Sequence, residues 1–277
     1  MFYLSGFADE IHESIDEQIR VLKELNIHSI EVRGVDGRNI STLTLDETQS
    51  LYEKLTVNGI SVSAIGSPLG KISLDDPFEP HLALFDHVMQ QAQILKTKYV
   101  RMFSFYNAVD RCEEVMARLE VFLQHTPAGI TLLHENEKGI YGDNAERCLD
   151  ILKHFENAPM RATFDPANFI QVGEDVPKAF ELLKPYITYM HVKDAQYSDG
   201  EVVPAGMGDG HWPLLIENLR DMQFDGFLSL EPHLTNFIGF AELEQETVEK
   251  ADKSQGATLF RLAAQKLKVL LKEEEIR

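Results

Sequence analysis

Three acidic residues and one histidine close four successive short apolar segments in the second half of the chain: Glu135, Asp165, His191 and Glu231. Each segment has the two-residue alternation of a β-strand, in which every second side chain points to the same face. We therefore expect the four side chains to point into one place. Three carboxylates that converge repel one another, so either their pKa values rise or a cation neutralises them. The added imidazole favours the cation.

The donor set indicates which cation would bind. Three carboxylates and one imidazole make an oxygen-rich site, which suits Mn2+, Mg2+ or Co2+ and is also compatible with Zn2+. A structural zinc site would show more cysteine and histidine. A helix cap or a loop hydrogen bond would explain any one of these residues alone. The shared alternation at four successive segment ends favours the metal site.

Eight apolar segments alternate with eight helical patterns along the chain. The predicted strands span 2–7, 28–33, 60–66, 98–105, 129–137, 160–168, 186–194 and 226–233. The predicted helices span 15–25, 45–57, 79–96, 109–125, 144–156, 175–184, 213–222 and 256–273. Strands that alternate with helices indicate parallel βαβ units. Eight such units predict an α/β fold, a single (β/α)8 TIM barrel over residues 1–277, with a site at the carboxyl ends of its strands.

Two features of this pattern bear on the domain organisation. A doubly wound sheet is the rival fold, but the loop after the first predicted strand lacks the glycine-rich fingerprint typical of that fold. Residues 234–255, after the eighth strand, are longer than a strand-to-helix loop needs. We expect them to form a lid or an oligomer contact, with a solvated surface insertion as the alternative.

Charge and composition limit the partners. The chain has 45 Asp and Glu against 26 Lys and Arg, a net charge of −19, which repels phosphate backbones and anionic lipids. No apolar run reaches the length of a membrane span, and the first residues do not resemble a signal peptide. Cys112 and Cys148 lie far apart and form no metal-binding spacing. These features predict a cytoplasmic protein with no nucleic-acid or membrane partner.

Several motifs resemble those of one superfamily across nearly the whole chain. They are SIEVR (29–33), HENE (134–137), FDPAN (164–168), MHVKD (190–194), PAGMGDGHWP (204–213) and the stretch 206–231 that ends at Glu231. The chain resembles the xylose-isomerase-like TIM barrels, a superfamily of sugar isomerases and epimerases that also contains endonuclease IV. The four acidic and histidine positions match that superfamily's ligand set, while no motif names a substrate.

The resemblance implies a metal-dependent reaction. It implies that Glu135, Asp165, His191 and Glu231 bind one divalent ion, Mn2+ being the expected one, and that Glu135 and Glu231 exchange protons with the substrate. The implied enzyme is an isomerase or epimerase that acts through an enediolate on a small sugar, polyol ketone or hydroxy-carbonyl compound. A metal-dependent dehydratase or lyase and a catalytically idle ligand-binding barrel are the alternatives.

The resemblance also suggests substrate contacts. In the superfamily, the glutamate that matches Glu31 often faces the substrate. Asn168 and Tyr197 stand where ketose 3-epimerases usually carry a histidine and an arginine, so this chain departs from that pattern. Lys193 matches the HxKD stretch of inosose-type members. We predict that Glu31, Asn168, Lys193 and Tyr197 bind the substrate, and that the enzyme could form a homo-oligomer.

Endonuclease IV is the rival within the superfamily. Its three-zinc cluster needs additional histidines, and the second, third and fourth predicted strands end without one. His134 and His233 lie next to proposed ligands with the opposite alternation, so we expect them to point outward. Asp209, in the glycine-rich loop 206–210, would repel a phosphate. These points favour an unphosphorylated sugar, polyol or keto-acid.

Overall fold

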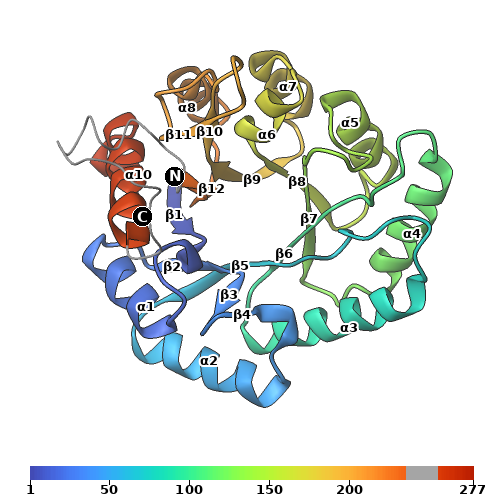
Figure 1. Cartoon of the computed structure of the whole chain (residues 1–277), viewed down its shortest axis with the longest axis horizontal. Coiled ribbons are helices and arrows are strands. Elements are labelled where there is room, and N and C mark those ends of the chain that lie inside the picture. The colour runs from blue at the N-terminus through green and yellow to red at the C-terminus, as the bar shows by residue number, and fades with distance from the viewer. Residues whose placement is uncertain (235–254) are drawn as a thin grey trace.

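Eight parallel strands form the central barrel of the computed structural model, which describes residues 1–234 and 255–277. The strands are β1 (Phe2–Gly6), β2 (Ser29–Val32), β5 (Ser61–Gly66), β6 (Tyr99–Met102), β7 (Thr131–Glu135), β8 (Met160–Phe164), β9 (Ile187–Val192) and β12 (Gly226–Leu230). The sheet runs β1-β12-β9-β8-β7-β6-β5-β2. A parallel bridge between Phe7 and Glu31 joins its two ends. The predicted TIM barrel is confirmed (Figure 1).

Helices surround this barrel (Figure 1). They are α1 (Ile15–Glu24), α2 (Leu45–Val57), α3 (Phe78–Ile94), α4 (Cys112–His125), α5 (Ala145–His154), α6 (Pro166–Gln171), α7 (Val176–Leu183), α8 (Trp212–Asp221) and α10 (Gly256–Leu270). A capping box explains why helix α2 begins at Leu45. The Thr44 hydroxyl accepts a hydrogen bond from the Glu47 N–H, and the Glu47 carboxylate accepts one from the Thr44 N–H. This reciprocal cap satisfies two N–H groups that the first turn leaves unpaired.

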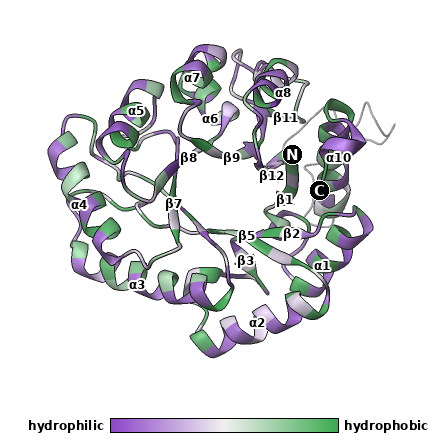
Figure 2. Cartoon of the chain, turned by 180° about the vertical axis from the view of Figure 1, so that it is seen from behind, coloured by the Kyte–Doolittle hydropathy of each residue, from purple (hydrophilic) through white to green (hydrophobic). Residues whose placement is uncertain are grey.

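Apolar side chains fill two separate layers. The larger core lies between the strands and the helices, and Figure 2 shows hydrophobic and hydrophilic residues alternating along the helices, as expected when one helix face packs inward. Inside the barrel, Ala64, Leu133 and Tyr189 form a smaller cluster. The Ser63 hydroxyl lies 2.8 Å from the Tyr189 hydroxyl, so the buried phenol has a partner. The filled interior gives the strand ends a rigid base.

The sixth predicted strand is wrong at its carboxyl end. Strand β8 stops at Phe164, and helix α6 begins at Pro166. The Asp165 carboxylate accepts a hydrogen bond from the Asn168 N–H, and Pro166 occupies the first turn, where a proline costs no helical hydrogen bond. The predicted strand 160–168 therefore included the capped first turn of helix α6.

Two short hairpins extend the loops at the barrel mouth and were not predicted. Strands β3 (Gly34–Val35) and β4 (Arg38–Asn39) follow β2, and β10 (Asp194–Ala195) and β11 (Val202–Val203) follow β9. Both pairs are antiparallel. The second hairpin lengthens the path from β9 to α8 and determines where the residues after Lys193 lie.

Most of the predicted insertion at 234–255 lies outside the described residues, so its role and the single domain over 1–277 stay predictions. Within the two described ranges, no helix has both the length and the hydropathy that a membrane crossing requires.

Candidate functional site

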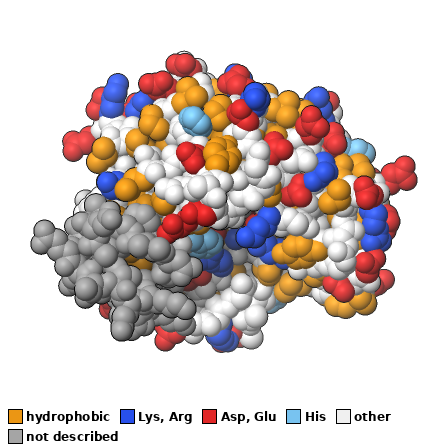
Figure 3. Space-filling model, turned by 45° about the horizontal axis from the view of Figure 1, so that its top comes forward, with side chains coloured by type: hydrophobic (Ala, Val, Ile, Leu, Met, Phe, Trp, Pro, Cys, Tyr) orange, Lys and Arg blue, Asp and Glu red, His pale blue; other side chains and the backbone are white. Residues whose placement is uncertain are grey.

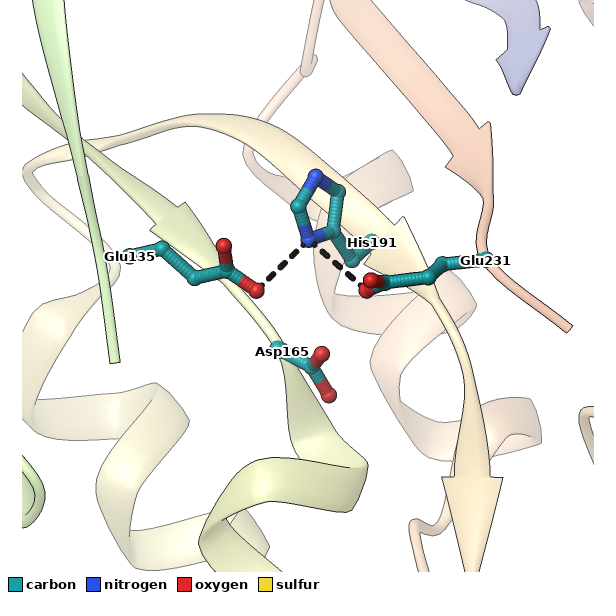
Figure 4. Close-up of side chains that lie close together, drawn as sticks. All are labelled: Glu135, Asp165, His191 and Glu231. Carbon is teal, nitrogen blue, oxygen red and sulfur yellow. Dashed lines mark hydrogen bonds and ion pairs between the residues drawn. The ribbon is translucent and has the colours of Figure 1, made fainter. Parts of the chain in front are cut away.

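Four buried side chains meet at the carboxyl ends of neighbouring strands. Glu135 ends β7, His191 lies in β9, and Asp165 and Glu231 directly follow β8 and β12. Each offers one ligand atom, and these four atoms lie within 4.8 Å of one another. Figure 4 shows Glu135 and Glu231 on either side of His191, with Asp165 near them at the start of a helix. The structure thus brings together the four residues that the sequence analysis singled out.

The group is held by contacts among its own members. His191 Nδ1 lies 2.9 Å from Glu135 Oε1 and 3.2 Å from Glu231 Oε2. Lys193 Nζ lies 2.6 Å from Asp165 Oδ2 and 3.1 Å from Glu231 Oε2. The Nδ1 atom therefore faces the carboxylates, and the lysine bridges two of them.

Burial and the neighbouring charges change the pKa values of these side chains. Burial, together with the charges of Glu231 and Glu135, raises the pKa of Asp165 to about 7 against the opposing effect of Lys193. Burial also opposes charge on His191, but the surrounding carboxylates outweigh it and raise the imidazole pKa. For Glu231, Lys193 and His191 overcome the effect of burial and lower the carboxyl pKa. This buried, oxygen-rich donor set is consistent with one divalent metal ion.

Glu31 lies beneath His191 and is buried. Glu31 Oε2 accepts a hydrogen bond of 2.6 Å from the Ser229 hydroxyl and lies 3.2 Å from His191 Nε2. The β2–β5 register shifts between Ile30 and Glu31, which a regular strand count does not anticipate. The structure therefore places Glu31 against the far nitrogen of the imidazole and not in the cavity wall that the described residues form.

This contact suggests a positioning role for Glu31. A carboxylate that accepts the Nε2–H of a histidine fixes the tautomer that leaves the Nδ1 lone pair free for a metal. Glu31→Gln is expected to weaken the binding of Mn2+ by about 10–100-fold, because the amide oxygen is a weaker acceptor than the carboxylate. Calorimetric titration of the metal-free protein measures this affinity, with Ser229→Ala as the matched variant that leaves the Glu31–His191 contact in place. Unchanged Mn2+ affinity in Glu31→Gln would assign the contact a purely structural role.

Asn168 and Lys193 line a cavity of about 370 Å³ whose wall includes Glu135 and Glu231. The Asn168 side chain donates a 2.9 Å hydrogen bond to the Asn136 carbonyl, and its Nδ2 lies 3.4 Å from Glu135 Oε1. The Lys193 ammonium points to the ligand group, as its alternation with His191 predicts. Both side chains are therefore within the site.

The structure does not bring Tyr197 to the site. Its hydroxyl donates a 2.6 Å hydrogen bond to the Glu174 carbonyl, and 44% of the residue is exposed. Tyr197 is absent from the described cavity wall. Tyr197 lies in the turn between β10 and β11, so a substrate contact of this residue stays a prediction.

Two arginines that the sequence analysis missed also line the cavity. Arg101 Nε in β6 lies 3.2 Å from Glu135 Oε2. Arg33, after β2, forms ion pairs with Asp9, Glu10 and Glu231. A charged residue inside an otherwise apolar strand is the signal that could have pointed to Arg101, because a buried charge requires a partner.

The outward direction expected for His233 is wrong. His233 lines the cavity, and its Nε2 lies 3.2 Å from Glu10 Oε1. Its φ of 45° takes the backbone out of strand geometry, so the alternation that holds within β12 no longer applies. His134 agrees with the expectation: it lies 2.9 Å from the Ser104 hydroxyl and does not contribute to the described cavity wall.

Comparison with known proteins places the chain among proteins of this architecture. The family model described as "Xylose isomerase-like TIM barrel" matches residues 19–255. The uncharacterised protein YihM of Escherichia coli (strain K12) is 22% identical over 238 residues, which cover 82% of this chain and 67% of YihM.

Solved structures share the fold at low sequence identity. The probable 3-DHS dehydratase AsbF from Bacillus anthracis has a TM-score of 0.72 and 20% identity, covering 97% of this chain and 99% of AsbF. D-psicose 3-epimerase from Clostridium cellulolyticum H10, solved with D-tagatose, has a TM-score of 0.73 and 14% identity, covering 97% of this chain and 98% of that one. The superfamily includes sugar epimerases, isomerases and dehydratases. This chain belongs to the xylose isomerase-like TIM-barrel family.

Proposed function

We propose that this chain is a divalent-metal-dependent isomerase or epimerase of a small sugar, polyol ketone or related hydroxy-carbonyl compound, acting through an enediolate. One observation carries the proposal: the ligand atoms of Glu135, Asp165, His191 and Glu231 lie within 4.8 Å of one another beside the 370 Å³ cavity. A cavity of this size fits a small molecule.

These four residues would hold the ion, and Mn2+ suits their oxygen-rich set best, with Mg2+, Co2+ and Zn2+ compatible. When bound, the ion supplies a Lewis acid that polarises the substrate carbonyl. Glu135 and Glu231 then have separate tasks: one carboxylate takes the proton from the carbon next to the carbonyl, and the other returns a proton. Their positions on either side of His191 support this division (Figure 4).

The remaining cavity residues orient the substrate. The Lys193 ammonium lies beside Glu231, so it can donate a hydrogen bond to a substrate oxygen close to the proton carrier. The Asn168 amide adds a second polar contact at the same wall. Tyr197 has no place in this proposal, because its hydroxyl is bound to the Glu174 carbonyl. The homo-oligomer and the cytoplasmic location stay predictions.

A dehydratase or lyase is the second candidate. Loss of a hydroxyl from the carbon beyond the enolised one requires an acid next to the base, and the ammonium of Lys193 lies 3.1 Å from Glu231 Oε2. The first proton abstraction is the same in both reactions, so the products distinguish them. The described residues offer no observation that favours the idle ligand-binding barrel.

Deuterium exchange tests the proposed function directly. The Mn2+-loaded protein is incubated in D2O with a panel of ketoses, inososes and keto-acids, and the recovered compounds are analysed for deuterium and for new products. We expect deuterium next to the carbonyl of at least one compound, lost when the metal is removed. Deuterium-free recovery across the whole panel would reject an enediolate reaction on these classes, and a dehydrated product would select the second candidate.

A further inference from the structure

Cations outnumber carboxylates among the described residues that line the cavity, whereas the chain as a whole is acidic. The chain has a net charge of −19. Of the described residues that line the cavity, five are Lys or Arg and three are Glu. Figure 3 shows a face with a hollow in which lysine, arginine and histidine side chains gather near acidic ones. Because the local field decides which ligand a pocket attracts, this wall favours an anion.

Three of these five cations have partners in the ligand group. Arg101 lies against Glu135, and Lys193 against Asp165 and Glu231. Arg33 lies against Glu231 and is also paired with Asp9 and Glu10. A divalent ion held by the carboxylates of the ligand group would balance their charge. The positive charges of Arg101 and Lys193 would then be less compensated in the loaded enzyme than in the metal-free one, which adds to the attraction of an anion.

Two lysines stand farther out on the wall. Lys71, in the loop between β5 and α3, lies 3.0 Å from Glu137 Oε2. Lys138 follows Glu137 in the loop after β7, is exposed, and forms no ion pair among the described residues. Glu137 therefore pairs with the Lys71 ammonium, and its other oxygen accepts a hydrogen bond from the Lys138 backbone N–H. The Lys138 ammonium has no carboxylate partner among the described residues, and a negative charge on a ligand would supply one.

The Phe103 ring lies between Lys71 and Arg101, which contacts the ligand group. Lys71 Nζ lies 4.2 Å from the ring centroid, and Arg101 Cζ lies 4.5 Å from the same centroid. Phe103, Lys71 and Arg101 all line the cavity. A substrate whose hydroxy-carbonyl end lies at the ligand group would run along this ring, with its far end toward Lys71 and Lys138.

We propose that the substrate carries a carboxylate, bound by Lys71 and Lys138, with Arg101 nearer the ligand group. This inference rests on the proposed function and names its substrate class: a hydroxy-keto acid or sugar acid in place of a neutral ketose. The lysines provide the charge, and the hydroxy-carbonyl end provides the reacting carbons.

A carboxylate fits better than a phosphate. TIM barrels often bind phosphate at the loops after the seventh and eighth strands, and here the loop 206–210 is already filled by a side chain. The N–H groups of Gly206, Gly208 and Gly210 donate to the Asp194 carboxylate at 2.9, 3.0 and 2.8 Å. These N–H groups are therefore not available to a phosphate.

Binding of three related probes tests this inference. The Mn2+-loaded protein is titrated by calorimetry with D-gluconate, with its neutral counterpart D-glucitol and with D-glucitol 6-phosphate. Gluconate is expected to bind at least tenfold more tightly than the other two. Lys71→Met and Lys138→Met should each weaken gluconate binding several-fold and together by tenfold or more, with glucitol unchanged. Glu137→Gln should tighten gluconate binding, because it releases Lys71.

Lys153→Met is the matched control, because it makes the same change in net charge on the last turn of α5, away from the cavity. Gluconate binding no tighter than glucitol binding, tighter binding of the phosphate, or equal losses in Lys153→Met would each overturn the inference. The deuterium panel separates the two proposals. Exchange with neutral ketoses but not with keto-acids would leave the proposed function standing and refute the carboxylate, whereas absence of exchange from every compound would refute the proposed function.

Discussion

Glu135→Gln and Glu231→Gln are each expected to lower turnover by about 10²–10⁴-fold, the range for a general acid–base group, while the barrel stays folded. A glutamine side chain keeps the size and one neutral oxygen of the glutamate, but it cannot accept and return a proton. The rate of deuterium exchange measures the effect. Because both residues are also proposed ligands, the bound metal of each variant must be measured in the same samples.

The control for these variants is Glu146→Gln, an exposed glutamate in the first turn of α5 that does not line the cavity. It changes the net charge equally and should retain normal turnover. If Glu135→Gln or Glu231→Gln keeps its metal and exchanges deuterium at a near-normal rate, that residue is not a proton carrier.

Lys193→Met is expected to lower kcat/KM by about 10–100-fold. Loss of a hydrogen bond to a charged group costs about 1.5–3 kcal/mol, and Lys193 Nζ is buried beside two carboxylates of the ligand group. Steady-state kinetics of the metal-loaded variant measure the loss. Methionine keeps most of the length of the lysine side chain, so the change removes the charge with little change in packing.

A second measurement separates two roles of Lys193. If the lysine binds substrate, the loss falls on kcat/KM at full metal occupancy. If it only holds Asp165 and Glu231 in place, Mn2+ affinity changes and kcat/KM of the loaded enzyme is retained. The latter result, or normal kinetics throughout, would contradict the substrate contact.

Sequence periodicity predicted the barrel because each strand and each helix buries an apolar face, and that face repeats locally. The alternation of side chains also placed Glu135 and His191, which lie within β7 and β9. Asp165, Glu231 and Lys193 lie just beyond the ends of their strands and still point to the site, as the alternation predicts. His233 lies farther from its strand and has a positive φ, so its direction depends on the loop and not on the strand.

Local hydrophobic periodicity cannot predict ion pairs between residues that lie far apart in the sequence. Arg33 pairs with Glu231, 198 positions away along the chain. The contact between Glu31 and His191 likewise depends on the closure of the barrel between β1 and β2. Tyr197 lies six positions from His191 in the sequence, but its hydroxyl is bound to the Glu174 carbonyl and the residue does not line the described cavity. Local patterns predict elements, whereas the partners of buried charges follow from the assembled fold.

Metal content tests the central claim most directly. The purified protein is stripped of metal, dialysed against excess Mn2+ and analysed by elemental analysis together with Asp165→Ala and His191→Ala. About one tightly held ion per chain is expected in the original protein, and both variants should lose that ion, with the fold of each verified by circular dichroism. Three zinc ions per chain in the protein as purified, or equal Mn2+ binding by the original protein and both folded variants, would contradict this claim.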